Sequence, residues 1–371
     1  MTGSELRQSA SIESAPLPEV RNHTRYPSQY FQMMDTNDQI FHVLVSRLTH
    51  DLTRLDAEGV PALTEEQAPL LEADQFYNQP NTSSCIQESD FAPYKPKCDV
   101  LLAHATAYAP MGRPNSRWPA GLRIGTWQKK LAVTGERLLK RGLFGWSLGQ
   151  PAKALQVPLR WEYAYGGASL WPLQPKEGQK AEIKKYHAQN PIGAGWADKA
   201  WLNKSRTDCL KAPQIEVFER PFGDWHANAM DYPAIGVGPT GRWWTPRKQK
   251  AGTYDQQWKE SRWPRLPQDF DFGYWNCAPE DQQIGYPEGG EDIVLAGFRE
   301  QEKEPLYCQL PRPQVHAVVR MQAGPVFAKP MRMDTLVFDL KAMTLSCVYR
   351  LALSADTGVR VLEIRNGRGA E

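Results

Sequence analysis

Four acidic residues in one Trp-rich stretch, Tyr232–Gln282, could carry out glycoside hydrolysis. They are Asp269, Asp271, Glu280 and Asp281. Glycosidases place two carboxylates on either side of the bond that is cleaved. Carboxylates two residues apart on a loop more often bond their own backbone or an arginine, and Arg262 and Arg265 are close in sequence. A carbohydrate-active enzyme is therefore the alternative interpretation of this stretch.

Two glycine motifs in the chain match known signatures, but their surroundings do not. Residues 236–241 spell G-x-G-x-x-G, which binds a dinucleotide only between a strand and a helix. Pro239 lies inside this motif and Pro246 follows it, so we expect a tight turn. Residues 145–149 spell G-x-S-x-G, which a hydrolase places between a buried strand and a helix. Pro151 follows it, so we expect a loop with Trp146 turned inward.

Composition and spacing give little support to metal, nucleic-acid or membrane binding. The seven histidines show no ligand spacing and the six cysteines form no Cys-x-x-Cys pair, so we expect free thiols, no metal and no cofactor. Residues 242–250 mix cations with indoles, as single-strand binders do, but we interpret them as indole–guanidinium packing. The net charge is only +2, no apolar run could span a bilayer, and the first residues lack a secretory signal. We therefore expect a cytoplasmic protein with no nucleic-acid or membrane partner.

The elements that would position these residues are mainly strands. Strand-like patterns occupy 41–55, 97–108, 157–165, 291–299, 315–321, 335–340, 344–353 and 358–364, and 122–137 reads as two strands joined near 128–130. Short helices are expected at 181–189, at 197–205 and after Thr253, which has Gln256 at capping-box spacing.

The predicted fold is mainly β, with two β-sandwich- or barrel-like regions bridged by an irregular Trp/Pro/Gly-rich middle with a few short helices. Its parts are a mobile tail (1–27), an N-terminal β-rich region (28–167), a Trp-rich irregular region (168–289) and a C-terminal β-rich region (290–365). We expect the two β-rich regions to pack together. All thirteen tryptophans lie between Trp118 and Trp275. Disordered segments are poor in aromatic residues, so the middle should be ordered.

An ordered series of short motifs runs through the chain from Pro158 to Glu291. It comprises Pro158–Gly167, Asn190–Gly195, Pro213–Glu216, Gly236–Pro239, Trp244 with Arg247, Ala251–Asp255 with Trp258, Pro264–Pro267, Asp269–Asp271, Ala278-Pro279, Asp281-Gln282 and Gly290-Glu291. In this order the motifs resemble a family catalogued as a domain of unknown function, found beside type VI secretion genes and regarded as effector adaptors or chaperones. The resemblance covers roughly Arg25 to Arg350, and it departs mildly at Glu136, where the family pattern has Asp.

The resemblance implies a protein that binds a secreted effector and helps load it onto the VgrG–PAAR spike, with no catalytic residues. Trp, Tyr and Arg are the usual anchors of protein interfaces. The partner-binding candidates are Trp243, Trp244, Arg247, Arg262 and Trp263. The residues expected to shape the scaffold are Gly166, Gly167, Gly193, Gly195, Gly236, Gly238, Trp258, Asp269 and Asp271.

Overall fold

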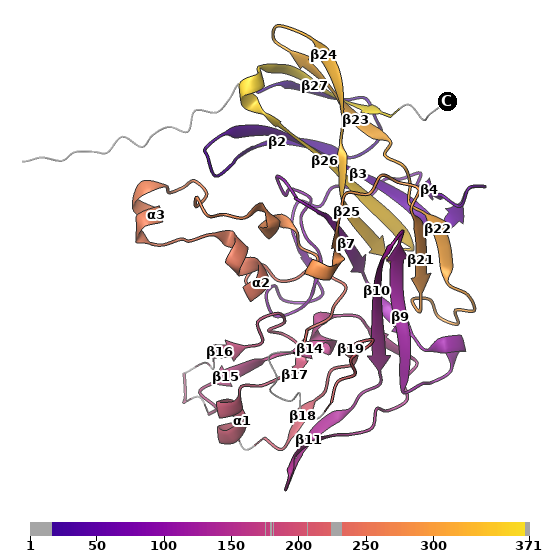
Figure 1. Cartoon of the computed structure of the whole chain (residues 1–371), viewed down its shortest axis with the longest axis vertical. Coiled ribbons are helices and arrows are strands. Elements are labelled where there is room, and N and C mark those ends of the chain that lie inside the picture. The colour runs from indigo at the N-terminus through magenta and orange to yellow at the C-terminus, as the bar shows by residue number, and fades with distance from the viewer. Residues whose placement is uncertain are drawn as a thin grey trace, which may run out of the picture.

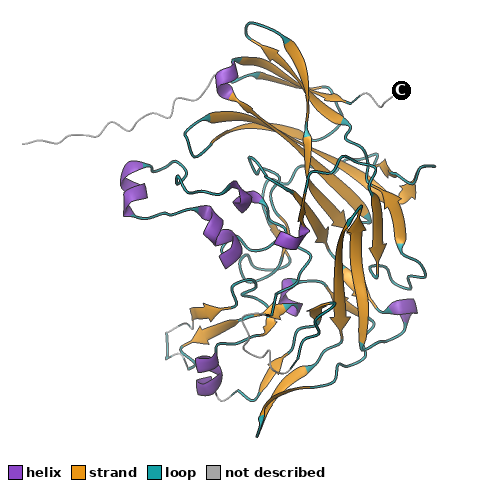
Figure 2. Cartoon of the chain, viewed as in Figure 1, coloured by secondary structure: helices purple, strands orange, loops and turns teal. Residues whose placement is uncertain are grey.

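The computed structural model describes residues 17–174, 176–178, 180, 182–205, 207–223 and 232–367. Strands dominate, and the helices are few and short (Figure 2). The prediction of a mainly β protein is confirmed. Three larger sheets make up the body, and small sheets and short helices extend from it (Figure 1).

The largest sheet has seven strands in the order β2-β3-β26-β25-β7-β20, with β4 paired to β3. Their bounds are β2 Ser28–Met34, β3 Ile40–Leu55, β4 Pro61–Leu63, β7 Cys98–Ala103, β20 Gln283–Ile284, β25 Arg332–Asp339 and β26 Thr344–Ser354. The strand predicted at 41–55 is confirmed, and the strands predicted at 335–340 and 344–353 form an antiparallel hairpin. β25 runs parallel to β7 and lies beside it, although the two are far apart in sequence.

A five-stranded sheet has the order β19-β10-β9-β21-β22. Its strands are β9 Arg117–Ile124, β10 Trp127–Thr134, β19 Ile215–Val217, β21 Asp292–Ala296 and β22 Leu306–Gln309. The two strands predicted within 122–137 exist, but the turn near 128–130 was wrongly placed. The chain turns at Gly125, whose φ of 54° is a conformation that glycine adopts without strain.

A four-stranded sheet has the order β1-β27-β23-β24. Its strands are β1 Glu19–Asn22, β23 Val315–Met321, β24 Val326–Pro330 and β27 Val359–Asn366. Most of the mobile tail predicted over 1–27 lies outside the described residues. The described part contradicts it, because β1 pairs with β27 and Tyr26 is only 5% exposed. The partner strand lies at the other end of the chain, so local sequence could not reveal this pairing.

One hydrophobic core joins the three sheets. It includes Leu44 and Val100 from the seven-stranded sheet, Leu131 from the five-stranded sheet, and Val319 and Leu362 from the four-stranded sheet. Strands from the predicted regions 28–167 and 290–365 alternate within the same sheets. The two β-rich regions are therefore one body rather than two separate sandwiches or barrels (Figure 1).

Small sheets and short helices build the rest. The sheets are β5 Gln75–Phe76 with β6 Cys85–Gln87, β8 Thr106–Tyr108 with β13 Gln156–Pro158, β14 Tyr165–Gly166 with β17 Ala194–Gly195, β15 Ala168–Trp171 with β16 Glu182–Tyr186, and β11 Leu138–Gly142 between β12 Gly145–Leu148 and β18 Cys209–Lys211. The α-helices are α1 Lys199–Ser205, α2 Thr245–Lys248 and α3 Gln256–Ser261. Single 3-10 turns span 110–112, 161–163, 249–251, 272–275, 280–282 and 355–357.

Three further local predictions are wrong. Residues 157–165 do not form one strand, because Trp161–Tyr163 is a 3-10 turn. Residues 182–186 form β16 rather than a helix, since pairing with β15 overrides the local preference. Asp255, not Thr253, caps α3, and its side chain accepts from the Trp258 backbone N–H at 2.8 Å.

Candidate functional site

A pair of perpendicular indoles clamps the Trp-rich segment, residues 232–282, onto the body. The ring centroids of Trp161 and Trp244 lie 5.2 Å apart at 87°, and both residues are 3% exposed. The Trp161 indole N–H lies 3.2 Å from the Gly238 carbonyl and 2.9 Å from the Pro239 carbonyl. The G-x-G-x-x-G motif thus packs against an indole of the protein itself.

Gly236 supplies a direct test of this packing role. A Cβ built there would lie 2.7 Å from three atoms of the buried Trp161 ring, whereas one at Gly238 meets its nearest atom at 3.4 Å. We expect Gly236→Ala to lower the free energy of unfolding by about 1–3 kcal/mol, because a buried indole cannot yield without repacking. Gly238→Ala is the matched control and should be nearly neutral in urea unfolding. Equal losses in the two variants would contradict this role.

Arg247, which follows Trp244 closely in sequence, is buried and helps to hold the same segment. Its guanidinium pairs with both carboxylate oxygens of Glu88 and donates to the carbonyls of Thr240 at 2.8 Å and Tyr274 at 2.9 Å. Burial alone would lower the pKa of Arg247, but the Glu88 carboxylate holds it above its ordinary value. Trp244 and Arg247, both expected to contact a partner, are therefore each 3% exposed and have their contacts inside the fold.

Asp99 on β7 holds the far end of the segment. Its carboxylate is fully buried and accepts from Lys95 Nζ at 2.8 Å, Asn276 Nδ2 at 3.0 Å, and the backbone N–H groups of Cys277 at 2.9 Å and Ala278 at 3.2 Å. Sequence reasoning missed this residue. The available signal was an aspartate inside an apolar strand, where a charge needs partners.

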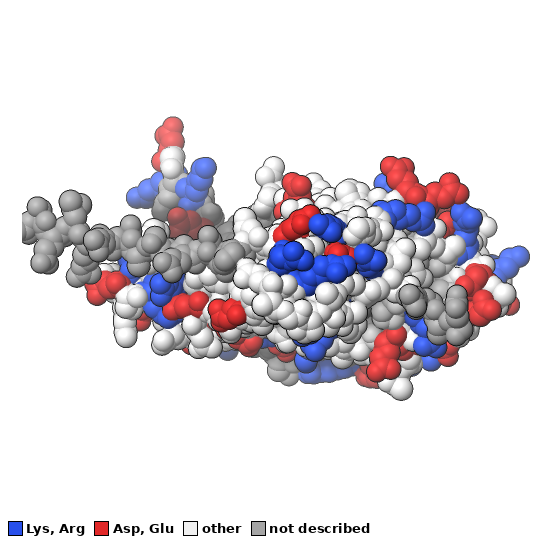
Figure 3. All heavy atoms as spheres, turned by 90° about the horizontal axis from the view of Figure 1, so that it is seen from above, with Lys and Arg blue, Asp and Glu red and all other residues white. Residues whose placement is uncertain are grey.

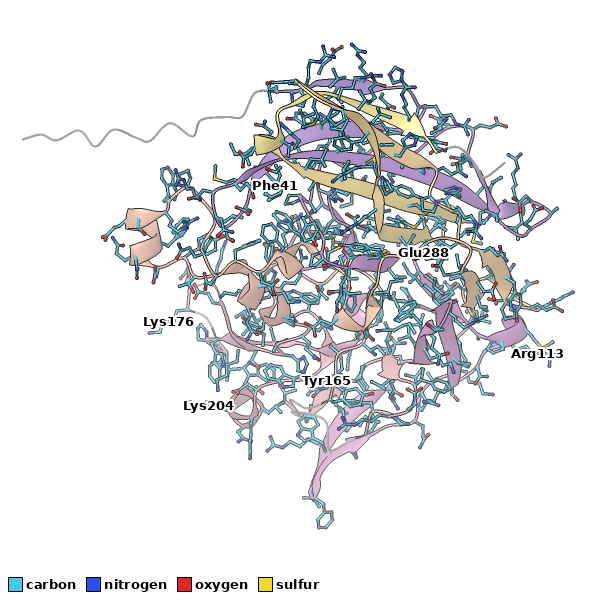
Figure 4. The ribbon with its side chains drawn as sticks, turned by 45° about the horizontal axis from the view of Figure 1, so that its top comes forward. Phe41, Arg113, Tyr165, Lys176, Lys204 and Glu288 are labelled. Atoms are coloured by element: carbon cyan, nitrogen blue, oxygen red, sulfur yellow. The ribbon has the colours of Figure 1, made fainter. Side chains whose placement is uncertain are left out.

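Two of the glycines expected to shape the scaffold, Gly166 and Gly193, lie against Asn190. This side chain donates to the carbonyls of Trp161 at 2.8 Å and Tyr165 at 3.1 Å. Gly166 has a φ of 148° and lies against Asn190, where a side chain would overlap it. A Cβ built at Gly193 would also overlap Asn190, whereas one at Gly167 would lie 2.7 Å from the Trp196 carbonyl oxygen and one at Gly195 would lie 2.7 Å from Pro213 Cδ. Tyr165, labelled in Figure 4, marks this cluster.

Residues 252–267 form an arm around α3 that projects from the body (Figure 1). Trp263 is 67% exposed and Tyr254 is 54% exposed. Tyr254 packs edge-on against Trp258 with ring centroids 4.7 Å apart, and the Trp258 indole donates to the Arg265 carbonyl at 3.0 Å. The arm therefore exposes the aromatic side chains of Tyr254 and Trp263 to solvent, and the contacts of Trp258 stabilise its conformation.

Asp38, in the turn between β2 and β3, fastens the arm to the body. Its two carboxylate oxygens accept from Arg262 at 2.8 Å and Arg265 at 2.9 Å. Arg262 also donates to the Thr36 and Leu266 carbonyls. Arg262 thus positions the arm, and both arginines pair with an acid outside their own segment although Asp269 and Asp271 are close to them in sequence. Trp243 is half-buried and packs edge-on against Tyr186, so Trp263 is the most exposed of the candidates.

The four acids considered for glycoside hydrolysis have separate local partners. Asp269 accepts from the Thr253 backbone and hydroxyl, and Asp271 accepts from the Gly273 N–H at 2.7 Å. The Thr253 backbone bond lowers the pKa of Asp269, which is opposite to what a general acid needs. The remaining two acids pair with lysines: Asp281 with Lys129, and Glu280 with Lys250 at 3.4 Å. These contacts favour scaffold roles.

A groove of about 340 Å³ runs between the segment and the body. Its apolar lining includes Pro233, Ala234, Ile235, Pro246 and Pro279. The Lys250–Glu280 pair lies at its rim, and Glu280 is 72% exposed. The groove is a second surface of this segment that could receive part of a protein chain.

The remaining sequence features considered for function are the G-x-S-x-G motif, the cysteines, the possible metal ligands and the helices. Ser147 of the G-x-S-x-G motif lies on β12 and donates to the Lys140 carbonyl at 3.3 Å. All six cysteines are free, and Cys209 is exposed while the other five are buried. Within the described ranges, no group of three or more His, Cys, Asp and Glu side chains could hold a metal ion. The helices in the same part of the chain are all too short or too polar to cross a membrane.

Lys and Arg side chains gather at the end of the molecule seen in Figure 3. On the four-stranded sheet at this end, Glu363 accepts from Arg320 at 2.6 Å and Arg365 at 2.8 Å, and Arg21 lies 4.0 Å away. The Arg320 hydrogen bond is the main reason that the pKa of Glu363 falls to about 2. Glu363 balances one of these three positive charges, and Glu19 pairs with Arg21 at 2.8 Å, so the end of the sheet keeps an excess of positive charge.

Fold and site together define a mainly β scaffold whose Trp-rich segment is clamped onto a shared core. A family model described as an uncharacterized protein conserved in bacteria, DUF2169, matches residues 38–350. The match covers most of the chain, so the chain belongs to the DUF2169 family. Comparisons with curated proteins and with solved structures found no match.

Proposed function

We propose that this protein is a cytoplasmic adaptor or chaperone of type VI secretion, which binds a cognate effector and helps load it onto the VgrG–PAAR spike. The ordered motif series and its family resemblance suggest this role. The observation that carries it is the α3 arm, which presents exposed aromatic side chains on a braced support. We assign effector contact to this arm.

The arm has the properties of an interface anchor. Trp and Tyr are enriched among the residues that contribute most to protein binding, and Trp263 and Tyr254 are the exposed examples here. The Asp38 contacts hold the arm in place before any partner arrives. Such preorganisation reduces the conformational entropy lost on association.

We expect Trp263→Ala to weaken effector binding by roughly thirtyfold, because truncation of a central aromatic anchor typically costs about 2 kcal/mol or more. The measurement is titration calorimetry with the purified effector encoded beside this gene. Tyr307→Ala is the matched control, since Tyr307 is 60% exposed but lies on β22 outside the arm. Equal affinity of the Trp263→Ala variant and the parent protein would remove the arm from the binding site.

The alternative function, a carbohydrate-active enzyme, makes a different prediction for Asp269. A screen for sugar release, with Asp269→Asn as the control, separates the two classes of protein. Sugar release that this single change abolishes would contradict a protein that acts only as an adaptor. The contacts of Asp269 with Thr253 support the adaptor instead.

A further inference from the structure

The hairpin of β11 and β12 ends in two fully exposed apolar side chains. Leu143 is 98% exposed and Phe144 is 104% exposed. No other large apolar side chain in the described part of the chain is as exposed. The hairpin projects from the body at the lower end of Figure 1. Folding gains nothing from these two side chains, so their exposure calls for another explanation.

The base of the hairpin is firmly held. Leu139 is fully buried in a cluster with Tyr165, and Trp146 and Leu148 pack against that cluster. β18 pairs along β11, and the Arg141 N–H donates to the Asp208 carbonyl at 2.7 Å. The body therefore supports the apolar tip on a paired ribbon.

Cations lie directly behind the tip. Lys140 and Arg141 are consecutive residues of β11, so their side chains leave opposite faces of the ribbon. Residues 138–149 contain no Asp or Glu. Glu136, at the base, pairs with Lys211 at 3.4 Å. The hairpin itself therefore carries two positive charges and no negative one.

We propose that the β11–β12 tip inserts into the headgroup region of an anionic lipid bilayer. Leu and Phe beside Lys and Arg are typical of segments that lie in the membrane interface. Cations near a bilayer surface are attracted by anionic lipids. Leu is under-represented among the residues that anchor protein interfaces, so a hydrophobic pocket on a partner protein fits this tip less well than a bilayer does. This inference does not rest on the adaptor proposal, and it revises the expectation of no membrane partner.

The test is cosedimentation with vesicles of phosphatidylglycerol and phosphatidylethanolamine, compared with vesicles of phosphatidylcholine. The intact protein should bind the anionic vesicles more strongly. Leu143→Ser with Phe144→Ser should lower the partition coefficient at least about tenfold, because two apolar side chains no longer leave water. Both side chains are exposed, so the melting temperature should not change.

Two further variants separate the contribution of the two cations to vesicle binding from that of the α3 arm. Lys140→Ala with Arg141→Ala should remove the preference for anionic lipid, and added salt should do the same to the intact protein. Trp263→Ala, in the α3 arm, should bind vesicles as the intact protein does. Equal binding of the intact protein to both kinds of vesicle would overturn the proposal. Unchanged vesicle binding by the Leu143→Ser/Phe144→Ser variant would also overturn it. If the intact protein bound no vesicles and this variant lost effector binding, the tip would instead contact a partner protein.

Discussion

Replacing Asp99 with Ala should lower the free energy of unfolding by about 3–5 kcal/mol, because removal of one partner leaves a buried charge uncompensated. The Lys95 ammonium would stay in the interior, and the N–H groups of Cys277 and Ala278 would lose their acceptor. The change should also loosen the Trp-rich segment from β7, since these contacts join the two.

Urea unfolding followed by tryptophan fluorescence measures this loss. Asp269→Ala is the matched control, because Asp269 is an exposed carboxylate of the same segment that bonds Thr253. Its effect should be much smaller. A loss for Asp99→Ala no greater than that of the control would show that the Asp99 network does not hold the segment.

Acidification should destabilise the protein strongly between pH 6.5 and pH 4. His50 and His187 are each 1% exposed, and burial lowers the pKa of both from 6.5 to about 4. A folded-state pKa below the unfolded one gives stability that is complete above pH 6.5 and is lost as the pH falls toward 4. Each histidine accounts for about 3 kcal/mol of this loss by pH 4.

The check is the free energy of unfolding at a series of pH values for the parent protein and for His187→Phe. Phe suits the site because His187 packs edge-on against Tyr165, with ring centroids 5.1 Å apart. Between pH 6.5 and pH 4, the free energy of unfolding of the variant should fall with pH about half as steeply as the histidines make it fall in the parent protein, since His50 still titrates. An unaltered slope would mean that His187 does not remain neutral in the folded protein.

The sequence alone determined the β character of the chain and much of its local structure. Strands such as 315–321 and 344–354 are visible because their residue pattern is set by short-range alternation and burial. Proline, glycine and indole constrain backbone and packing wherever they occur, so the sequence also led us to expect a scaffold role for the Gly and Trp motifs.

Only the tertiary structure decided which strands pair and which tryptophans face outward. β1 with β27 and β7 with β25 join residues from distant parts of the chain, and no local pattern encodes such partners. Trp244 and Trp263 lie in similar irregular, Pro- and Arg-rich sequence, where no periodicity distinguishes an inner from an outer face. Contact with Trp161 buries Trp244, whereas the Asp38 contacts of Arg262 hold the arm that exposes Trp263.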